Sequence, residues 1–409
     1  MKVYDVLVVG AGPAGGQSAR MLSKLGYKVL IIERVTDFSK NNFSSAGSTM
    51  YTVEEFNIDK KCISTYWSSI SVNVNKVHHK WNSNKPLGVI FEFKNLKQFL
   101  VDDAVANGAE ALFGTNFVSY KDNNGIYDVV IKDIKTGKEK VIRTKLIIDA
   151  TGPARKVLGR NPESKFGYGI GMEYLIEVPA EKYKPQTLTF FLGTKWVENG
   201  YGWMFAMKNR RFKVGSMQLK FHDEDALIDI ESKIKNIIKT KLKLNEDDYK
   251  FINKHGGTLI YSLGHNDFVY KDRILCVGDS ISSVNPLGGE GIRHSMETAK
   301  IAVKAIDDYF KDSKILGLNY QTEIENYYKC CKYDKSESIA MNMYKGNNDE
   351  LLEAGFKSIS HISIHDLFSI LFFYNFGIVF KHPKIFLNLI SDIGIIKLLR
   401  FGTLLLQAD

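Results

Sequence analysis

The hydrophobic pattern at the start of the chain predicts a strand, a helix and a second strand. Apolar residues dominate positions 4–9, an amphipathic segment extends to about Leu25, and a second apolar run covers positions 28–32. Short apolar runs that alternate with a helical pattern are typical of a parallel sheet with helices packed on it. We therefore expect an α/β fold at the N-terminus.

Strand and helix signals continue through the next part of the chain. The expected elements are a short helix near 53–57, strands at 68–77 and 87–93, a helix at 94–110, a hairpin around 135–137 and an apolar strand that ends at Asp149. The helix has a stop signal at Asn107-Gly108, because glycine is the favoured residue just after a helix C-terminus.

Strand-like segments then fill 167–219, a charged helix is expected at 224–242, and an apolar strand returns at 273–277. Strands near residues 4, 28, 145 and 273 would share one sheet if one domain interrupts another. We place the first domain at 1–65, 94–160 and 265–315, the second at 66–93 and 161–264, and a helical C-terminal region at 316–409.

The C-terminal region begins with one long polar-faced helix over 319–345. Between Asp366 and Lys381 lie 14 uncharged, mostly apolar residues, fewer than the roughly 20 that a bilayer span requires. This segment predicts a buried helix or the edge of an apolar tunnel. The amphipathic helix after it favours packing on another helix, and docking on a membrane surface stays open as the alternative.

A glycine-rich turn connects the first strand to its helix. Gly10 would make the tight turn, Gly12 would let the backbone approach a pyrophosphate, and Gly15 would allow the helix to pack closely on the strand. Glu33 ends the second strand, where an acidic side chain accepts hydrogen bonds from a ribose. The set predicts a cofactor that contains ADP.

Two further strand ends lead into glycine. The sequence "DATG" occupies 149–152, and "GDSISSVNPLGGEGIRHSMETA" begins at Gly278 with an Asp, a Pro and three closely spaced glycines before a helix. Ligands of open α/β sheets bind where the strands end, and a helix N-terminus stabilises negative charge there. All three junctions are expected to meet one long cofactor.

Charge narrows the range of partners. The 409-residue chain carries a formal charge of +9, but its lysines are scattered and not clustered with aromatic residues, which argues against nucleic acid. An anionic membrane surface or a phosphorylated substrate fits the charge at least as well.

The cysteines and the N-terminus indicate the compartment. Four cysteines show neither a CxxC pair nor a metal-site spacing with histidine, so we expect no metal and a reducing environment. The first strand starts within two residues of Met1, which leaves no room for a signal peptide. We expect a cytoplasmic protein that can associate with membranes.

Taken together, the three glycine junctions resemble the FAD-binding set of the p-hydroxybenzoate hydroxylase superfamily, and within it the geranylgeranyl reductase family. This resemblance implies an α/β fold with a Rossmann-like FAD-binding domain, interrupted by an antiparallel-sheet substrate domain and followed by a helical C-terminal region. FAD is the implied cofactor.

The resemblance also assigns residues to the cofactor. Gly10, Gly12 and Gly15 match the pyrophosphate turn and Glu33 the ribose acid, Asp279 matches the Asp at the ribityl chain, and Pro286, Gly288 and Gly289 match the loop laid against the flavin ring. The other expected cofactor contacts are Ala14, Arg34, Ala46, Gly47, Lys94, Asp149, Gly152, Gly278, Gly291 and Ile292.

The sequence "ENGYGWMFAM" resembles the YxWxFP signature of geranylgeranyl reductases, a strand that lines their substrate channel. Tyr201, Trp203 and Phe205 are thus the candidate catalytic residues, and as alternate residues of a strand they share one face. A core strand of packed aromatics is the other interpretation. The chain departs from the family at Ala206, at Lys94 and at 44–50, where the usual proline, arginine and cysteine-containing turn are replaced.

The resemblance implies an FAD-dependent reductase that saturates carbon–carbon double bonds of a geranylgeranyl or other polyprenyl chain, with NAD(P)H or ferredoxin as electron donor. A hydride would come from the reduced flavin and a proton from an acid or water that the sequence does not identify. The alternatives are a flavin monooxygenase or halogenase, a lycopene-cyclase-like enzyme without net redox change, and a non-catalytic lipid-binding flavoprotein.

Overall fold

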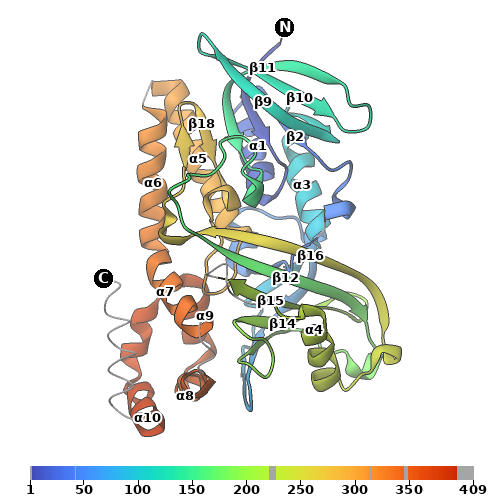
Figure 1. Cartoon of the computed structure of the whole chain (residues 1–409), viewed down its shortest axis with the longest axis vertical. Helices are drawn as coiled ribbons and strands as arrows, with labels where there is room; N and C mark the ends of the chain where they lie inside the picture. The colour runs from blue at the N-terminus through green and yellow to red at the C-terminus, as the bar shows by residue number, and fades with distance from the viewer. Residues whose placement is uncertain (1, 42, 221–226, 313–314, 345–348, 394–409) are drawn as a thin grey trace.

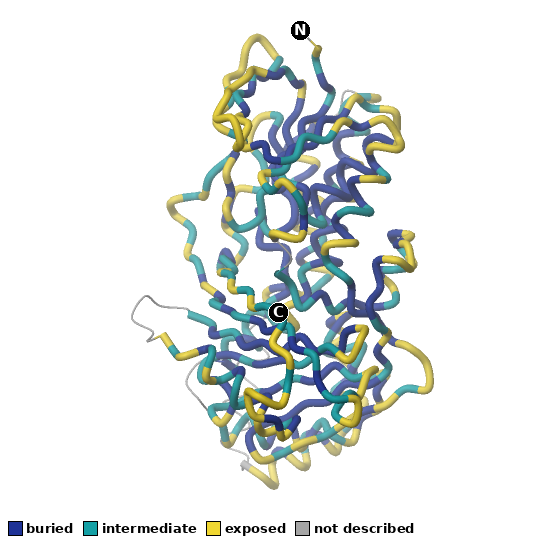
Figure 2. The backbone as a smooth tube through the Cα atoms, turned by 90° about the vertical axis from the view of Figure 1, so that its right-hand side faces the viewer, coloured by how far each residue is buried: buried dark blue, intermediate teal, exposed yellow. Residues whose placement is uncertain are grey.

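The computed structural model describes residues 2–41, 43–220, 227–312, 315–344 and 349–393. Two sheets lie one above the other along the long axis, and the C-terminal helices run down one side of both (Figure 1). Figure 2 shows buried positions running through both sheets, with the exposed positions mostly on turns and outer loops. The predicted α/β class is confirmed.

The first sheet has the strand order β17-β18-β11-β1-β2-β8, with β10 paired to the N-terminal half of β11 and β9 paired to β10. Strands β1 and β2 run parallel to each other, and β11 and β18 run parallel to β1 and β11 respectively. The four strands expected near residues 4, 28, 145 and 273 therefore share one sheet. The strands of this sheet are β1 (Val3–Val9), β2 (Val29–Glu33), β8 (Glu110–Phe113), β9 (Thr115–Asn123), β10 (Ile126–Asp133), β11 (Glu139–Asp149), β17 (Tyr270–Lys271) and β18 (Ile274–Cys276).

Three helices cover one face of this sheet: α1 (Pro13–Lys24), α3 (Phe93–Ala106) and α5 (Ile292–Asp312). Their apolar sides and the inward residues of the strands form one core cluster, which includes Val6, Leu22 and Ile306. The hairpin of β10 and β11 packs against the other face. Helix α3 is followed by Asn107 and by Gly108 with a φ of 98°, as the stop signal predicts.

The second sheet has the strand order β16-β12-β15-β14-β13-β5-β6 and is antiparallel except for the pairing of β13 with β5. Its strands are β5 (Ser69–Val74), β6 (Val77–Asn82), β12 (Phe166–Glu177), β13 (Thr187–Leu192), β14 (Gly200–Met207), β15 (Arg211–Lys220) and β16 (Lys250–Ser262). A small third sheet holds β3 (Gly47–Thr49), β7 (Gly88–Phe91) and β4 (Ile63–Trp67), with α2 (Met50–Glu55) after β3.

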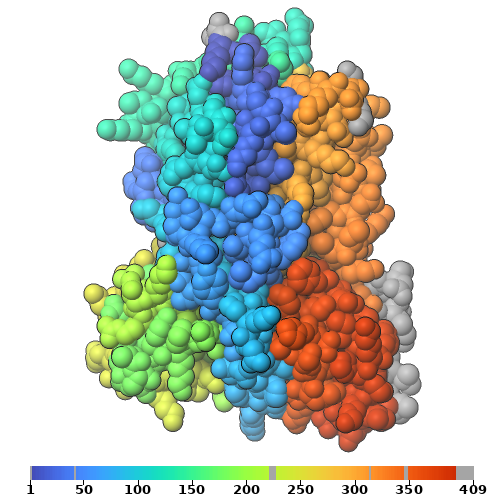
Figure 3. Space-filling view, turned by 180° about the vertical axis from the view of Figure 1, so that it is seen from behind, coloured from blue at the N-terminus to red at the C-terminus, as the bar shows by residue number. Residues whose placement is uncertain are grey.

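The two faces of the second sheet have different partners. Helix α4 (Ile230–Ile237) and the π-helical turn Ile238–Leu242 pack on one face through Ile234 and Ile237. The opposite face carries Trp203 and Phe205 and packs against the C-terminal helices. The space-filling view from behind shows those helices beside the segment near residues 66–90 (Figure 3).

Several boundaries differ from the sequence expectations. The strand expected at 68–77 is two strands, because Asn75 turns the chain with a φ of 44°. The charged helix expected from 224 begins at Ile230 within the described residues, and 221–226 lie outside them. The short helix expected near 53–57 begins earlier, at Met50.

The single long helix expected over 319–345 is wrong. The chain forms α6 (Leu316–Cys330) and α7 (Tyr333–Tyr344), separated at Lys332, whose φ is 51°. In one straight helix, residues five apart would point about 140° away from each other. The break lets Tyr328 and Tyr333 both reach one loop, where they donate to the carbonyl oxygens of Ile281 and Ser283.

The apolar segment at 366–381 is also divided. Helix α9 (Ile364–Phe373) ends at Tyr374, whose φ is 56°, and a 3₁₀ turn at Phe376–Lys381 follows. The other C-terminal helices are α8 (Asp349–Ile359) and α10 (Pro383–Ile393), and Ile385 and Leu389 of α10 are buried in the predicted helix packing. Within the described residues, no helix is long and apolar enough to span a bilayer.

Candidate functional site

The turn after β1 is as tight as its glycines predict. Gly10 has a φ of 100°, and a Cβ there would lie 2.4 Å from the carbonyl oxygen of Ala150. A Cβ on Gly15 would lie 1.9 Å from the carbonyl oxygen of Gly10. At Gly12 a Cβ would meet no protein atom within 4 Å. The turn is thus closed against the protein at Gly10 and Gly15 and open at Gly12, the N-cap residue of α1.

Glu33 lies at the end of β2, beside this turn. One carboxylate oxygen accepts a hydrogen bond from the Ala11 N–H at 2.8 Å and the other from the Val35 N–H at 3.0 Å. Arg34, the next expected contact, is exposed. Lys94 is half-exposed and pairs with Asp37 at 3.8 Å.

Lys97 is a basic residue near this region that the sequence did not single out. Its side chain is buried on α3, and its ammonium lies 4.8 Å from the ring centre of Phe38 and 4.5 Å from that of Phe93. Burial lowers the pKa of Lys97 to about 8, although the nearby Glu33 charge acts in the opposite direction. In the sequence, the position of Lys97 on the apolar face of the predicted helix was the signal that could have identified it.

Asp149 organises the second glycine junction. Its carboxylate accepts hydrogen bonds from the backbone N–H groups of Thr151, Val157 and Leu158, at 3.0, 3.1 and 3.2 Å. The side chain is fully buried, and these bonds hold the loop that contains Gly152. Asp149 therefore shapes the loop at the carboxyl end of β11.

Asp279 lies at the third junction, after β18. The residue is partly exposed, but its Oδ1 atom is enclosed and has no hydrogen-bond partner among the described residues. Burial raises the pKa of Asp279 to about 6. The preceding Gly278 has a φ of 64° and backs onto Ala14 of α1, so the loop abuts the first glycine turn. An enclosed acceptor of this kind fits a ligand hydroxyl group.

The aromatic strand β14 points at two of the expected cofactor loops. A Cβ on Gly289 would lie 2.5 Å from the Tyr201 hydroxyl, and a Cβ on Gly47 would lie 3.3 Å from the Phe205 ring. Trp203, between them, donates its indole N–H to Glu173 at 2.8 Å. The three aromatic residues therefore share a face, as predicted, and that face lies toward the loops.

A buried acid and base lie on the same face. Burial raises the pKa of Glu173 and lowers the pKa of Lys213, while each charge opposes the shift of the other. The Lys213 ammonium donates to the Ser44 carbonyl oxygen. This contact fixes the start of the turn that leads to Ala46, which has a φ of 57°, and Gly47.

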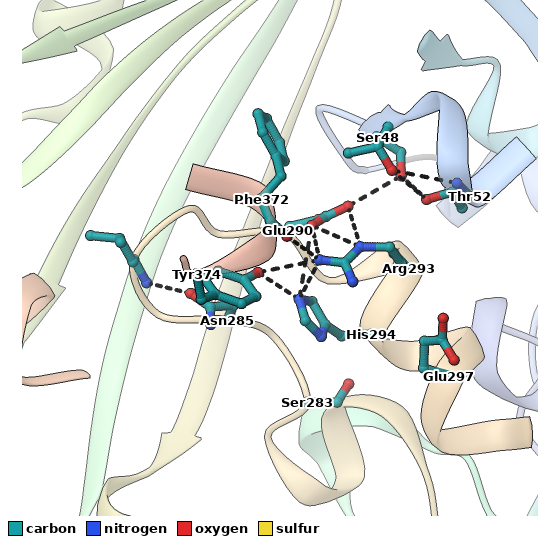
Figure 4. A network of polar contacts seen from close by, with 12 residues as sticks. Ser48, Thr52, Ser283, Asn285, Glu290, Arg293, His294, Glu297, Phe372 and Tyr374 are labelled. Carbon is teal, nitrogen blue, oxygen red and sulfur yellow. Dashed lines mark hydrogen bonds and ion pairs between the residues drawn. The ribbon is translucent and has the colours of Figure 1, made fainter. Parts of the chain in front are cut away.

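A polar network supports the loop that contains Gly289 (Figure 4). Arg293 donates to Glu290 at 2.8 Å and to the carbonyl oxygen of Phe372 at 2.7 Å. His294 lies 2.6 Å from the hydroxyl groups of both Tyr374 and Tyr327. The network joins the start of α5 to the end of α9. Sequence reasoning missed these residues, although adjacent charged residues at the start of an apolar helix were a visible signal.

His294 is neutral in this network. Burial, aided by the charge of Arg293, lowers the pKa of His294 well below its ordinary value. Its Nε2 atom faces the Arg293 guanidinium at 3.1 Å and therefore accepts a hydrogen bond. The proton consequently resides on Nδ1, which donates to Tyr327.

The face of the second sheet and the 284–291 loop enclose a small apolar cavity of about 60 Å³. Glycines at 167 and 169 of β12 remove side chains from its floor, and Tyr201, Met217 and Leu259 line it from neighbouring strands. Pro286 and Gly289 close it on the loop side, and α7 supplies a further wall. Other loop glycines lie beside it: Gly288 near the Leu371 carbonyl and Gly291 near Val284, just before Ile292 begins α5. Within the described residues, no group of three His, Cys, Asp or Glu side chains could hold a metal ion.

Comparisons with known proteins agree with this arrangement. The model of a family described as FAD binding domain matches residues 3–312. The digeranylgeranylglycerophospholipid reductase of Haloferax volcanii is 26% identical over 326 residues, which cover 76% of this chain and 77% of the relative.

Two solved structures share the fold. A geranylgeranyl bacteriochlorophyll reductase-like protein from Thermoplasma acidophilum superposes with a TM-score of 0.78 at 18% identity, over 96% of this chain and 97% of the other. A flavin-dependent brominase superposes with a TM-score of 0.66 at 14% identity, over 94% and 93%.

Substitution of Gly15 by Ala tests the tight turn. Because the new Cβ would overlap the Gly10 carbonyl, we expect a loss of about 2 kcal/mol or more in unfolding free energy and weaker retention of the cofactor. Gly355→Ala in α8 is the matched control, since its Cβ meets nothing within 4 Å and a helical alanine adds about 0.5–1 kcal/mol. Thermal melting and the flavin-to-protein absorbance ratio measure both. A Gly15→Ala protein that keeps both values would contradict the turn geometry.

Asp279→Asn tests the enclosed carboxylate. The folded pKa of Asp279 is raised, so its favourable contribution is present below pH 4 and is lost as the pH rises through about 6. The cofactor-free Asn variant should therefore be more stable than wild type at pH 8, by on the order of 2 kcal/mol, with no such gain at pH 4. Denaturant unfolding at both pH values measures the difference, and equal curves would refute it. Binding of added flavin should weaken in the same variant.

Proposed function

The chain belongs to the FAD binding domain family and is an FAD-dependent oxidoreductase, and from this premise we propose that it saturates carbon–carbon double bonds in polyprenyl chains of isoprenoid lipids. The observation that carries the proposal is the aromatic, glycine-cleared face of the second sheet opposite the 284–291 loop. The names of the digeranylgeranylglycerophospholipid reductase relatives, at 25–26% identity, support the substrate class.

The residues at the three junctions fit FAD. The open space at Gly12 and the backbone N–H groups at the start of α1, which no N-cap side chain contacts, would accept the pyrophosphate, because an α-helix N-terminus favours negative charge. Glu33 would accept from the adenosine ribose and Asp279 from the ribityl hydroxyl groups. Pro286 and the glycines that follow would lie against the flavin ring. We retain the remaining cofactor contacts of the sequence analysis as part of this proposal.

The polyprenyl chain would lie along the sheet face that carries Tyr201, Trp203 and Phe205. An isoprenoid chain offers no charged group near its double bonds, so binding must rest on apolar contact. Met217 and Leu259 provide such contact next to Pro286 and Gly289. The C-terminal helices cover this face and exclude water from it.

When bound in its reduced form, FAD supplies the hydride that such a saturation needs. The protein's part is to hold the double bond against the 284–291 loop and to keep the site dry, which raises the effective concentration of the reacting groups. Trp203 is held by Glu173 and cannot turn away from the sheet face without losing that bond. Rigid aromatic side chains of this kind are suited to orienting the substrate more than to taking part in the reaction itself.

The proposal extends to the electron donor and to membrane contact. NAD(P)H or ferredoxin would reduce the flavin, and the lipid would be taken from a membrane surface. The C-terminal helices support this contact: Phe380 and Leu387 are 69% and 64% exposed, and Lys381 and Lys384 lie exposed beside them. Apolar residues flanked by lysines favour an anionic lipid surface.

An anaerobic single-turnover experiment tests the proposed reaction. The bound flavin is reduced chemically, a digeranylgeranyl glycerophospholipid is added, and flavin absorbance and lipid mass are followed. We expect flavin reoxidation with a gain of two hydrogen atoms in the lipid for each bond reduced. The fully saturated lipid is the control and should leave the flavin reduced.

The same experiment separates the alternatives. Flavin that stays reduced until oxygen is admitted, and then yields an oxygenated or halogenated product, would replace the reductase by a monooxygenase or halogenase. An altered lipid of unchanged mass would indicate a cyclase-like reaction. Lipid binding without reaction under every condition would leave only a carrier role.

A further inference from the structure

A single acidic residue lies between the inner cavity and the outside of the molecule. The inner cavity of about 60 Å³ touches Pro286 and Gly289, and an outer, open cavity of about 470 Å³ lies between α7 and the end of β16. Glu337 and Met341 of α7 line both cavities. Any proton that moves from the surface to the inner cavity by this path passes Glu337.

The surroundings of Glu337 favour its protonated form. Burial raises the pKa of Glu337 above its ordinary value, and the negative charge of Asp334 on the same helix acts in the same direction. The Gly264 N–H, which donates to its Oε2 at 3.2 Å, and the Tyr261 hydroxyl oppose the shift only in part.

Tyr261, His265 and Tyr328 face Glu337 from other elements, and in their neutral forms none of them is a stronger acid than its carboxyl group. Tyr261 of β16 bonds to Glu337 and lies 3.1 Å from Nε2 of His265. Burial lowers the pKa of His265 to about 3, so this ring is neutral. The Tyr328 hydroxyl on α6 donates to the Ile281 carbonyl oxygen. No cation among these neighbours holds Glu337 in its ionised form.

Other buried acids near the loop have different partners. Glu290 is paired with Arg293, and Glu173 accepts from Trp203 beside Lys213. Asp279 lies at the cofactor end of the loop. Of the carboxylates in the described part of the chain, Glu337 alone lines the inner cavity.

We propose that Glu337 is the catalytic acid of the reduction and the port through which its proton enters. This role rests on the proposed function. As the carbon–carbon π bond is lost, a hydride from the reduced flavin forms one new C–H bond, and the proton of the Glu337 carboxyl group forms the other. The carboxylate then regains a proton from solvent through the outer cavity, so each saturated bond consumes one hydride and one proton.

Glu337→Gln is the first test, because it keeps the shape and the hydrogen-bonding capacity of the side chain and removes the acidic proton. We expect the rate of lipid reduction in the anaerobic assay to fall at least about 100-fold, the lower end of the contribution of general acids. Substrate binding should stay within a factor of about three. Glu323→Gln, an exposed position on α6, is the matched control and should retain the wild-type rate.

The pH profile and a conservative variant distinguish an acid from a structural contact. The wild-type rate should fall as the pH rises through the elevated pKa of Glu337, since the carboxylate form has no proton to give, and this fall should be absent in Glu337→Gln. Glu337→Asp restores a carboxylic acid, and its rate of lipid reduction should be at least about tenfold higher than that of Glu337→Gln. Equal rates in the Gln and Asp variants would assign Glu337 a packing role only.

Infrared difference spectroscopy of the oxidised holoprotein provides a readout that is independent of turnover. Titration of wild type upward from acid pH should show loss of the carbonyl bands of protonated carboxyl groups, and the component that is absent in Glu337→Gln but kept in Glu323→Gln belongs to Glu337. A wild-type protein that reduces lipid, with Glu337→Gln equally active, would overturn the acid role alone. A wild-type protein that reduces no lipid would overturn the proposed function and this role together.

Discussion

The structure depends on fixing a loop that has few side chains of its own to pack. The segment from β18 to α5 runs over Gly278, Gly288, Gly289 and Gly291, and such backbone would be mobile if it were left unsupported. The hydroxyl groups of Tyr320, Tyr328 and Tyr333 donate to carbonyl oxygens at 276, 281 and 283. The Glu290–Arg293 pair then fastens the far end of the loop to α9. The helical C-terminal region is thus part of the site, because it holds the loop in place from behind.

The second sheet packs against the same loop on the side opposite the C-terminal helices. Tyr201 lies against Gly289 and Phe205 against Gly47, so a Cβ at either glycine would crowd the end of the aromatic side chain. Lys213 adds a polar anchor at Ser44. Burial of Lys213 with Glu173 is costly unless both find partners, and the bonds to Ser44 and Trp203 supply them. The aromatic face is therefore held at a fixed position over the loops by contacts on both sides.

Local signals made part of this arrangement predictable. The tight turn at Gly10 and Gly15, the parallel strands and the shared face of Tyr201, Trp203 and Phe205 follow from short-range patterns, and so they could be predicted from the sequence. The breaks at Lys332 and Tyr374 could not, because neither position carries glycine or proline. Each break is stabilised by a contact far along the chain, from Tyr333 to Ser283 and from Tyr374 to His294. For the same reason the contacts of Arg293 with Phe372 and of Glu337 with Gly264 were visible only in the folded structure.

Two acids near the loop, Asp279 within it and Glu337 on α7, show how one physical cause can serve two roles. Burial raises the pKa of both Asp279 and Glu337. Asp279 presents an enclosed oxygen without a partner among the described residues, to which the hydroxyl groups of the proposed cofactor could donate and so stabilise its ionised form. Glu337 lies beside Asp334 at the boundary of an apolar cavity, where the hydrogen bonds from Gly264 and Tyr261 offset the rise of its pKa only in part. Asp279 would thus act as a hydrogen-bond acceptor and Glu337 as a proton donor. The hydrogen-bond partners available to each acid, more than burial itself, determine this difference.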